Sequence, residues 1–274
     1  MSEAVVLVHG ARTSSSQWDL QLPGLQQAGY RTVAPDLPGH GMRRGEPFTL
    51  SSATATLLGA VHGAGAGPGT VHLVGSSLGG MLAIHAAAAL YGSDIDPPGT
   101  GAHGSSDTAM RSPLASLTLC GSAVQPSPRS ARLYGFALRA VDHLPGSGPR
   151  GPRRSGRERA GDSSVPLIHS LVLGPRGVEA YRRGGRAGPE VVVPTMAAVT
   201  GLDLRAELRR IPVPVTILSP RFDQLRMHER SFARAAPRGR VVTLGYGTHL
   251  VNLTQPERFT EDLLRVLDGT PPSH

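Results

Sequence analysis

Residues 70–92 read TVHLVGSSLGGMLAIHAAAALYG, and the fold can be worked out from this stretch outward. Its first part is largely apolar, as in a strand buried on both faces of a parallel sheet. Its last part is rich in small and apolar residues, which suits a helix packed closely on that sheet. Between the two stands a G-x-S-x-G motif, Gly75 to Gly79, with Ser77 at its centre. Such a sharp strand-to-helix turn predicts a strained central residue with an exposed hydroxyl.

Ser77 is therefore the candidate nucleophile. It also begins the predicted helix, where unpaired backbone N–H groups and the helix dipole favour developing negative charge. Its neighbour Ser76 lies outside the frame of the two glycines, so we expect a structural role for it. In a chain with 35 Gly the motif alone says little, but the strand before it and the helix after it are what the motif requires.

Strand and helix patterns alternate on both sides of this stretch. The predicted strands cover residues 4–10, 30–41, 70–75, 116–123, 213–223 and 240–249. The predicted helices outside 76–92 cover residues 16–29, 226–236 and 256–268. This alternation predicts an α/β fold with a mostly parallel central sheet and helices on both faces.

The alternation is interrupted twice. Residues 92–113 are polar and rich in Gly, Ser and Pro, which predicts a long surface insertion. From 125 to 210 helical patterns flank an Arg/Gly-rich segment, which predicts an inserted helical cap. We therefore expect one catalytic core formed by 1–124 and 211–274, with the cap at 125–210; a chain of 274 residues is long enough for this arrangement.

A serine hydroxyl needs a base, and that base needs a carboxylate. His249 follows the last predicted strand and a Gly-rich turn, and it precedes a helix that starts with Pro, so it lies on a loop at the carboxyl edge of the sheet. Asp223 ends the preceding strand and projects from the same edge. The order Ser, Asp, His fits this arrangement. Asp223 could instead be a turn residue or helix cap, and Asp36 is a rival acid whose PDLPGHG setting resembles a structural turn.

An acyl-transfer site also needs two donors for the oxygen that becomes negatively charged. The backbone N–H of Leu78, directly after the nucleophile, is one candidate. The second is the N–H of Ala11, in the loop after the first strand, with His9 and Gly10 shaping the turn. Arg12 and Trp18 are candidates for the substrate pocket, and packing alone would also explain them.

These motifs, VVLVHG, APDLPGHG, VGSSLGG, SPRFD and GTHLVNLTQPERF, resemble the α/β-hydrolase superfamily, specifically its small bacterial members with a helical cap. The resemblance covers about 1–90, 116–123 and 211–268, but neither 92–113 nor the cap. It implies the α/β-hydrolase fold, with Ser77 as nucleophile, His249 as base and Asp223 as acid, and with the Ala11 and Leu78 amides as the oxyanion hole. SPRFD departs from the family in lacking the usual glycine ahead of the acid.

The composition bears on partners and location. All 28 basic residues are Arg, and residues 125–210 hold 15 Arg against 7 Asp or Glu, so the net charge of +8 resides in the insertion. A solvated cap explains this, and an anionic or carrier-bound substrate is the alternative; aromatic residues, at 4%, are too scarce to suggest nucleic-acid binding.

The single Cys120 excludes an intrachain disulfide. Neither a signal peptide nor an apolar run long enough to span a bilayer is visible, so we expect a cytoplasmic protein without membrane partners.

The sequence thus predicts a serine hydrolase that cleaves a carboxylic ester or thioester through an acyl-enzyme. Neither a metal-ligand cluster nor a phosphate-binding loop is present in the pattern, so no cofactor is expected. The same fold also supports lyases and carbon–carbon bond hydrolases, and the GC-rich style of the sequence raises a role in secondary metabolism. A non-catalytic ligand-binding protein is the third hypothesis. Substrate identity and oligomeric state stay open.

Overall fold

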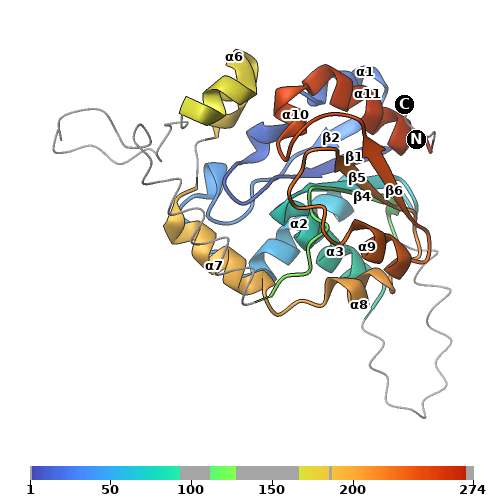
Figure 1. Ribbon diagram of the computed structural model, residues 1–274. Helices are drawn as coiled ribbons and strands as arrows, with labels where there is room; N and C mark the ends of the chain where they lie inside the picture. The colour runs from blue at the N-terminus through green and yellow to red at the C-terminus, as the bar shows by residue number, and fades with distance from the viewer. Residues whose placement is uncertain (1, 93–111, 128–166, 185–186, 270–274) are drawn as a thin grey trace, which may run out of the picture.

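A sheet of six parallel strands forms the centre of the computed structural model, which describes residues 2–92, 112–127, 167–184 and 187–269 (Figure 1). The order is β2-β1-β3-β4-β5-β6. The strands are β1 (Ala4–Val8), β2 (Arg31–Val33), β3 (Val71–Ser76), β4 (Leu114–Cys120), β5 (Val215–Pro220) and β6 (Gly239–Leu244). Strands β2 and β3 pair with opposite sides of β1, so the strand order reverses there, and the carboxyl ends of β1 and β3 are the position at which open α/β sheets bind ligands.

The central strands are buried on both faces, as their apolar runs predict. Every residue of β1 and β3 is buried. Alternate side chains of β1 enter different cores, because successive residues of a strand point to opposite faces. Val6 and Val8 join one apolar cluster, and Val5 and Leu7 join the other.

Helices cover both faces of the sheet, which confirms the predicted fold class. The helices that supply one face are α2 (Leu50–Ala64), α3 (Leu78–Leu90), α8 (Leu204–Leu208) and α9 (Glu229–Ala235) (Figure 1). The other face is covered by α1 (Leu22–Gln27), α10 (Val251–Thr254), α11 (Pro256–Leu267) and the short 3-10 helix η1 (Ser15–Trp18). A second 3-10 turn, η2, spans Gly41–Arg43.

Helix α2 has no counterpart among the predicted elements. Thr49 caps it, since its side chain accepts from the Ser52 N–H while Ser52 Oγ accepts from the Thr49 N–H. Its buried residues recur at helical spacing: Ala53, Leu57, Val61 and Ala64. Both signals are present in the sequence, but most of the helix surface is Ala, Gly, Ser and Thr, so the apolar stripe is narrow.

Two predicted elements are shorter than expected. The strand expected at 30–41 is only Arg31–Val33, because Pro35 and Pro38 lack the N–H groups that would continue the ladder. The helix expected at 16–29 is divided into η1 and α1. Pro23 lies in the first turn of α1, where proline is well tolerated, so it marks a new start.

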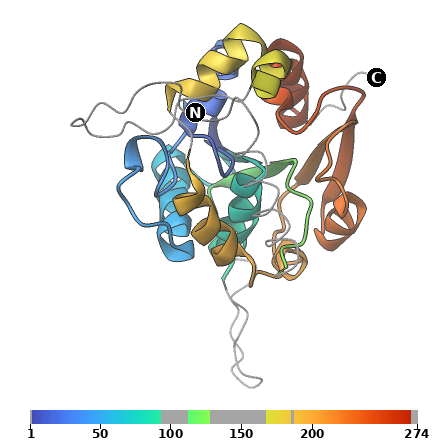
Figure 2. The ribbon, with the colours of Figure 1, turned by 60° about the vertical axis from the view of Figure 1, so that its left-hand side comes forward.

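Between β4 and β5 the described chain contains α6 (Leu167–Arg183), which has a kink at Gly174, and α7 (Pro189–Val199), followed by α8. Figure 2 shows α7 beside α2 and α6 beside the carboxyl-terminal helices, and contacts link α6 to α10 and η1. The part of the predicted surface insertion at 93–111 and the part of the predicted cap at 128–166 lie outside the described residues.

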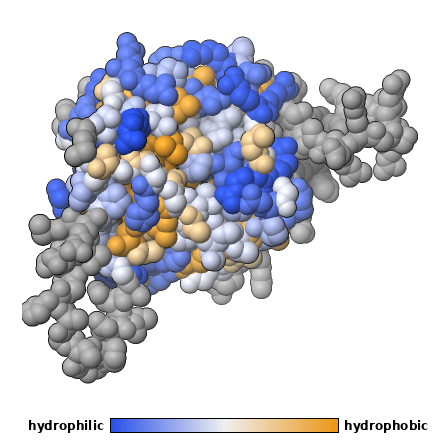
Figure 3. Space-filling model, turned by 180° about the vertical axis from the view of Figure 1, so that it is seen from behind, coloured by the Kyte–Doolittle hydropathy of each residue, from blue (hydrophilic) through white to orange (hydrophobic). Residues whose placement is uncertain are grey.

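The surface is mainly polar. Seen from behind, apolar residues form small groups among polar ones (Figure 3). Among the described residues, four large hydrophobic side chains are exposed: Met42, Val193, Phe222 and Met227. In the same part of the chain we find no helix with both the length and the apolar character needed to cross a membrane.

Candidate active site

Ser77 occupies a strained turn between β3 and α3. Its φ is 55° and its ψ is −121°, and it is the sole non-glycine residue with positive φ in the described part of the chain. The flanking glycines allow the turn to pack closely on β1. A Cβ at Gly79 would lie 2.5 Å from the Val8 carbonyl oxygen, and one at Gly75 would lie 2.5 Å from the Gly80 Cα. This is the geometry expected from the G-x-S-x-G motif.

Asp223 and His249 come from the loops after β5 and β6. These loops are joined by backbone hydrogen bonds, in which the N–H groups of Arg221 and Phe222 donate to the carbonyls of Tyr246 and Gly247. The two side chains meet as the sequence predicts: His249 Nδ1 lies 3.1 Å from each carboxylate oxygen of Asp223. The carboxylate can only accept, so Nδ1 carries the proton and Nε2 keeps a free lone pair.

The Asp223 side chain is fully buried, whereas that of His249 is 20% exposed. Burial raises the pKa of Asp223, but the His249 hydrogen bond and charge, the Leu225 N–H and the Arg226 charge together outweigh it, so the pKa is lowered. Asp223 is therefore a carboxylate at neutral pH. It has the protonation state needed to orient the imidazole and stabilise an imidazolium.

The end of β4 connects Ser77 with the Asp223–His249 pair. The Ser77 N–H donates to the carbonyl of Cys120, at 2.8 Å. The next residue, Gly121, has φ of 57°, and a Cβ there would lie 2.7 Å from Asp223 Oδ2 and 2.8 Å from His249 Nδ1. Sequence reasoning missed Gly121, although a glycine directly after a buried strand was the available signal. Because Gly121 has no side chain, it leaves room for the Asp223 carboxylate and the His249 ring.

Two backbone N–H groups, those of Leu78 and Ala11, are the predicted oxyanion donors. The Leu78 N–H is the first of α3 and has no intrahelical acceptor. The Ala11 N–H has no acceptor among the described residues. It shares a peptide unit with the Gly10 carbonyl, which accepts from His9 Nδ1 at 2.8 Å and from Thr13 Oγ1 at 3.1 Å. A trans peptide directs N–H opposite to C=O, so these bonds orient the Ala11 N–H.

His9 is held in one tautomer. Its Nε2 accepts from the Leu37 N–H at 3.0 Å, so Nδ1 is the donor to Gly10. Complete burial lowers the pKa of His9 to about 3, with a further lowering by nearby His40, so the ring is neutral at physiological pH. His40 Nε2 lies 2.9 Å from the Ala11 carbonyl oxygen and holds the following peptide unit.

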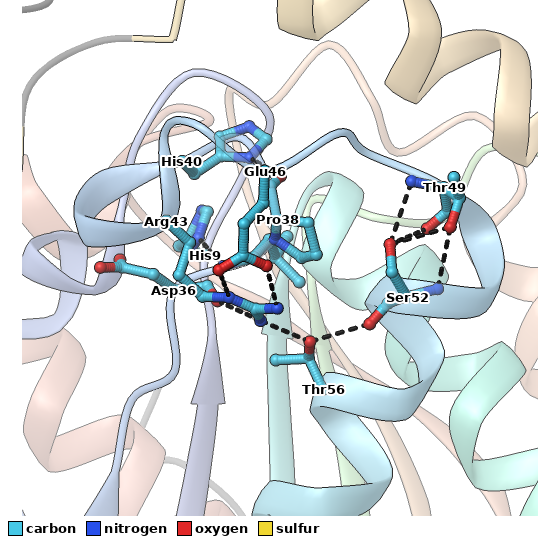
Figure 4. A network of polar contacts seen from close by, with 10 residues as sticks. His9, Asp36, Pro38, His40, Arg43, Glu46, Thr49, Ser52 and Thr56 are labelled. Atoms are coloured by element: carbon cyan, nitrogen blue, oxygen red, sulfur yellow. Dashed lines mark hydrogen bonds and ion pairs between the residues drawn. The ribbon is translucent and has the colours of Figure 1, made fainter.

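Asp36 belongs to the support beneath this loop (Figure 4). Its carboxylate accepts from the N–H groups of Ser15 and Met42, at 2.7 and 2.8 Å. Burial raises the pKa of Asp36, but these backbone bonds outweigh it and the pKa is lowered. The Arg43 guanidinium, paired with Glu46, lies beside it (Figure 4). Asp36 therefore organises the 36–46 turn, as its sequence setting indicates.

The two candidate pocket residues differ in their placement. Trp18 is completely buried, and its ring packs against Phe259 with centroids 6.4 Å apart, so in this structure it belongs to the core and presents no surface to a ligand. A packing role, rather than a role in the substrate pocket, fits Trp18. Arg12 is partly exposed, next to Ala11.

Other chemistries find little support in the described residues. No group of three or more His, Cys, Asp or Glu side chains is arranged there to hold a metal ion. Cys120 is buried, and burial together with the Asp223 charge raises the pKa of its thiol above the usual range. A thiolate nucleophile is therefore disfavoured at this position.

Comparison with known proteins gives a consistent result. The model of the alpha/beta hydrolase family matches residues 5–262. An "AB hydrolase superfamily protein" of Gibberella zeae is 38% identical over 82 residues, which are 30% of this chain and 29% of that relative. A protein of Agrobacterium fabrum named "Putative carbamate hydrolase RutD" is 24% identical over 281 residues, which cover 96% of this chain and 92% of the relative.

Solved structures agree on the fold. A thermophilic esterase from Thermogutta terrifontis superimposes with a TM-score of 0.66 at 21% identity, covering 98% of this chain and 90% of the esterase. The enol-lactonase from Burkholderia xenovorans LB400 has a TM-score of 0.66 at 20% identity, covering 98% and 92% of the two chains.

Proposed function

The chain belongs to the alpha/beta hydrolase family, and from this premise we propose that it cleaves a carboxylic ester or thioester through an acyl-enzyme formed on Ser77. The observation that carries the proposal is the convergence on the end of β4. The Ser77 N–H donates to the Cys120 carbonyl, and a Cβ on the next residue, Gly121, would lie within 2.8 Å of both Asp223 and His249. A serine hydroxyl is activated when a base that a carboxylate orients lies within hydrogen-bond reach of it, and we propose that His249 serves Ser77 in this way.

In the proposed mechanism, Ser77 Oγ attacks the substrate carbonyl carbon while His249 Nε2 takes the hydroxyl proton. Asp223 stabilises the resulting imidazolium through Nδ1–H. The N–H groups of Ala11 and Leu78 donate to the oxygen that becomes negative. When the carbonyl re-forms, the bond to the leaving group breaks and His249 returns its proton to that group. Water then repeats the sequence, with His249 as base, and releases the acid and the free serine.

The names of the similar proteins support acyl chemistry on this scaffold. One relative is named as a carbamate hydrolase, and two structural neighbours are an esterase and an enol-lactonase. In each case the named reaction class is hydrolysis at a carbonyl carbon that carries an oxygen substituent. The likeness to the structural neighbours concerns the fold, so the substrate has to be found by experiment.

An anionic or carrier-bound acyl donor is the alternative to a solvated cap as the explanation for the charge of the insertion, and it belongs in the substrate search. The segment 125–210, proposed here as a cap, holds 15 Arg against 7 Asp or Glu. A substrate panel should therefore pair neutral p-nitrophenyl esters with esters and coenzyme A thioesters that carry negative charge.

The first test is labelling with a fluorophosphonate probe. We expect a single adduct on the peptide containing Ser77, no adduct in Ser77→Ala, and strongly reduced labelling in His249→Ala. Peptide mass mapping locates the adduct, and circular dichroism shows that the variants are folded. Well-folded wild-type protein that resists the probe would refute the acyl-enzyme proposal and favour base-only lyase chemistry or ligand binding.

A further inference from the structure

Gln17 connects the three segments that make up the candidate active site. It lies in η1, directly after the loop that carries Ala11, and its side chain is only 1% exposed. The amide of this one side chain contacts the β1 loop, the residue before Ser77 and the helix that follows His249. A buried amide with this many partners is strongly constrained in position.

The oxygen end of the amide holds the β1 loop. Gln17 Oε1 accepts from the Gly10 N–H at 2.9 Å and from Thr13 Oγ1 at 2.7 Å. His9 holds the carbonyl of the same Gly10 from the other side. The two peptide units that meet at Gly10 are thus both anchored, and the second of them carries the Ala11 N–H.

The nitrogen end of the amide holds the nucleophile turn and the helix after the base. Gln17 Nε2 donates to Ser76 Oγ at 3.0 Å and lies 3.4 Å from Asn252 Oδ1. Asn252 in turn donates from Nδ2 to the Gln17 backbone carbonyl at 2.9 Å. The site of a Cβ on Gly10 lies 3.4 Å from Ser77 Cβ and 3.6 Å from Gln17 Oε1, so the loop, the nucleophile and the amide meet at one point.

We propose that Gln17 is a positioning residue that sets the Ala11 N–H relative to Ser77, and this role rests on the proposed acyl-enzyme function. The role requires an acceptor at one end of the side chain and a donor at the other. Leucine has neither, and an ionised glutamate has acceptors at both ends and adds a negative charge beside the oxygen that becomes negative during acyl transfer.

A purely structural role makes a different prediction, and Gln21 supplies the matched control. Gln21 is fully buried four residues further along the chain, and its Nε2 donates to the Asn252 carbonyl at 2.8 Å. No hydrogen bond joins Gln21 to Gly10 or Ser76 within the described structure. Gln17→Leu and Gln21→Leu therefore remove similar buried amides. Only Gln17→Leu removes the hydrogen bonds to Gly10 and Thr13 in the loop after β1.

The experiment compares wild type, Gln17→Leu and Gln21→Leu by the rate of fluorophosphonate labelling at Ser77 and by thermal melting. With the best ester of the panel, kcat and KM are measured separately. We expect Gln17→Leu to lower kcat and the labelling rate about 10- to 100-fold, with KM within about threefold, because loss of a preorganised oxyanion donor acts on the transition state. Gln21→Leu should lose comparable thermal stability while its kcat stays within about threefold of wild type.

Gln17→Glu adds a readout that packing does not influence. Wild-type activity should rise with pH and then level off, as expected of a reaction that needs its general base in the neutral form. In Gln17→Glu it should fall again at higher pH, because burial at this position raises the pKa of the introduced carboxyl, which then ionises only as the pH rises. Gly10, Thr13, Ser76 and Asn252, the partners of this amide, do not titrate near neutrality, and His9 is neutral there because burial lowers its pKa.

Each outcome is decisive. An unlabelled wild type overturns the proposed function and this role with it. If the wild type is labelled, two results overturn the positioning role alone. One is a Gln17→Leu variant that keeps its labelling rate and kcat, and the other is an equal loss of both in the two leucine variants. If Gln17→Leu does not fold, a Gln17→Glu profile of wild-type shape overturns it in the same way.

Discussion

His9 and His249 each have neighbours that keep a proton on Nδ1, yet they differ in what the other nitrogen does. In His249 the Asp223 carboxylate holds Nδ1–H, and Nε2 has no hydrogen-bond partner among the described residues. In His9 the Gly10 carbonyl accepts from Nδ1 and the Leu37 N–H occupies Nε2. Nε2 of His249 is thus open within the described structure, whereas both ring nitrogens of His9 are engaged and support the loop after β1.

The neutral state of His9 predicts a pH dependence of stability. Because burial lowers its pKa from 6.5 to about 3, the unfolded chain takes up a proton below pH 6.5 that the folded chain refuses. The free energy of unfolding should therefore fall as pH decreases from 6.5 towards 3, by at most about 1.4 kcal/mol per pH unit from this residue.

Urea denaturation at pH 6.5, 5.5 and 4.5 measures this dependence. His9→Gln should show a shallower slope of the free energy of unfolding against pH than wild type. His62→Gln, at an exposed position on α2, controls for the loss of a histidine as such. Equal slopes in wild type and His9→Gln would contradict a neutral buried His9.

At the scale of elements, the close packing of α3 on β1 requires glycine, whereas the packing of α2 does not require its Gly59. The turn at Ser77 brings α3 so close to β1 that a Cβ at Gly79 would lie 2.5 Å from two backbone carbonyls. Gly59, on the exposed side of α2, has nothing within 4 Å of the same position. The same residue type is thus a packing requirement in one helix and an entropic cost in the other.

Alanine substitutions should separate these two effects. Gly79→Ala should lower the free energy of unfolding by about 1–3 kcal/mol or more, since the neighbouring atoms are backbone and must shift. Gly59→Ala should raise it by about 0.5–1 kcal/mol through helix propensity. Chemical denaturation measures both, and a stability loss in Gly59→Ala similar to that in Gly79→Ala would rule out the close-approach argument.

At the scale of the whole molecule, the end of α6 is attached to η1, which follows the β1 loop, and to α10, which follows His249. Ser16 Oγ donates to the Ala180 carbonyl at 2.6 Å and accepts from the Gly184 N–H at 3.2 Å. Ala180 and Tyr181 also form an apolar cluster with Leu253 of α10. The insertion is therefore linked to the loop after β1 and to the helix after His249.

Ser16→Ala should loosen this attachment. It leaves the buried Ala180 carbonyl and the partly buried Gly184 N–H without this partner, at a cost of about 1–3 kcal/mol that falls on the α6 contact. We expect faster amide hydrogen exchange in residues 176–184 and unchanged exchange in β1 and β3. Ser231→Ala, which removes a single side-chain bond on α9, is the control. Exchange that rises uniformly across the sheet would instead indicate global destabilisation.

Local patterns in the sequence were sufficient for the fold class and for much of the site. Strand burial, the G-x-S-x-G turn and the loops ending in Asp223 and His249 follow from residue types at short range. Parallel strands bring their carboxyl ends to one edge, so the Asp223–His249 contact could be expected without coordinates. The strained φ of Ser77 follows from the motif in the same way.

Only the tertiary structure decided which side chains support that site. Gln17 bonds to Ser76 across 59 residues and to Asn252 across 235, and a Cβ at Gly121 would collide with a pair formed by two later loops. Trp18 proved to be a core residue for the same reason, because Phe259 packs against it from the far end of the chain. Contacts of this kind depend on how elements pack in three dimensions, and a periodicity read along the chain carries no information about a partner hundreds of residues away.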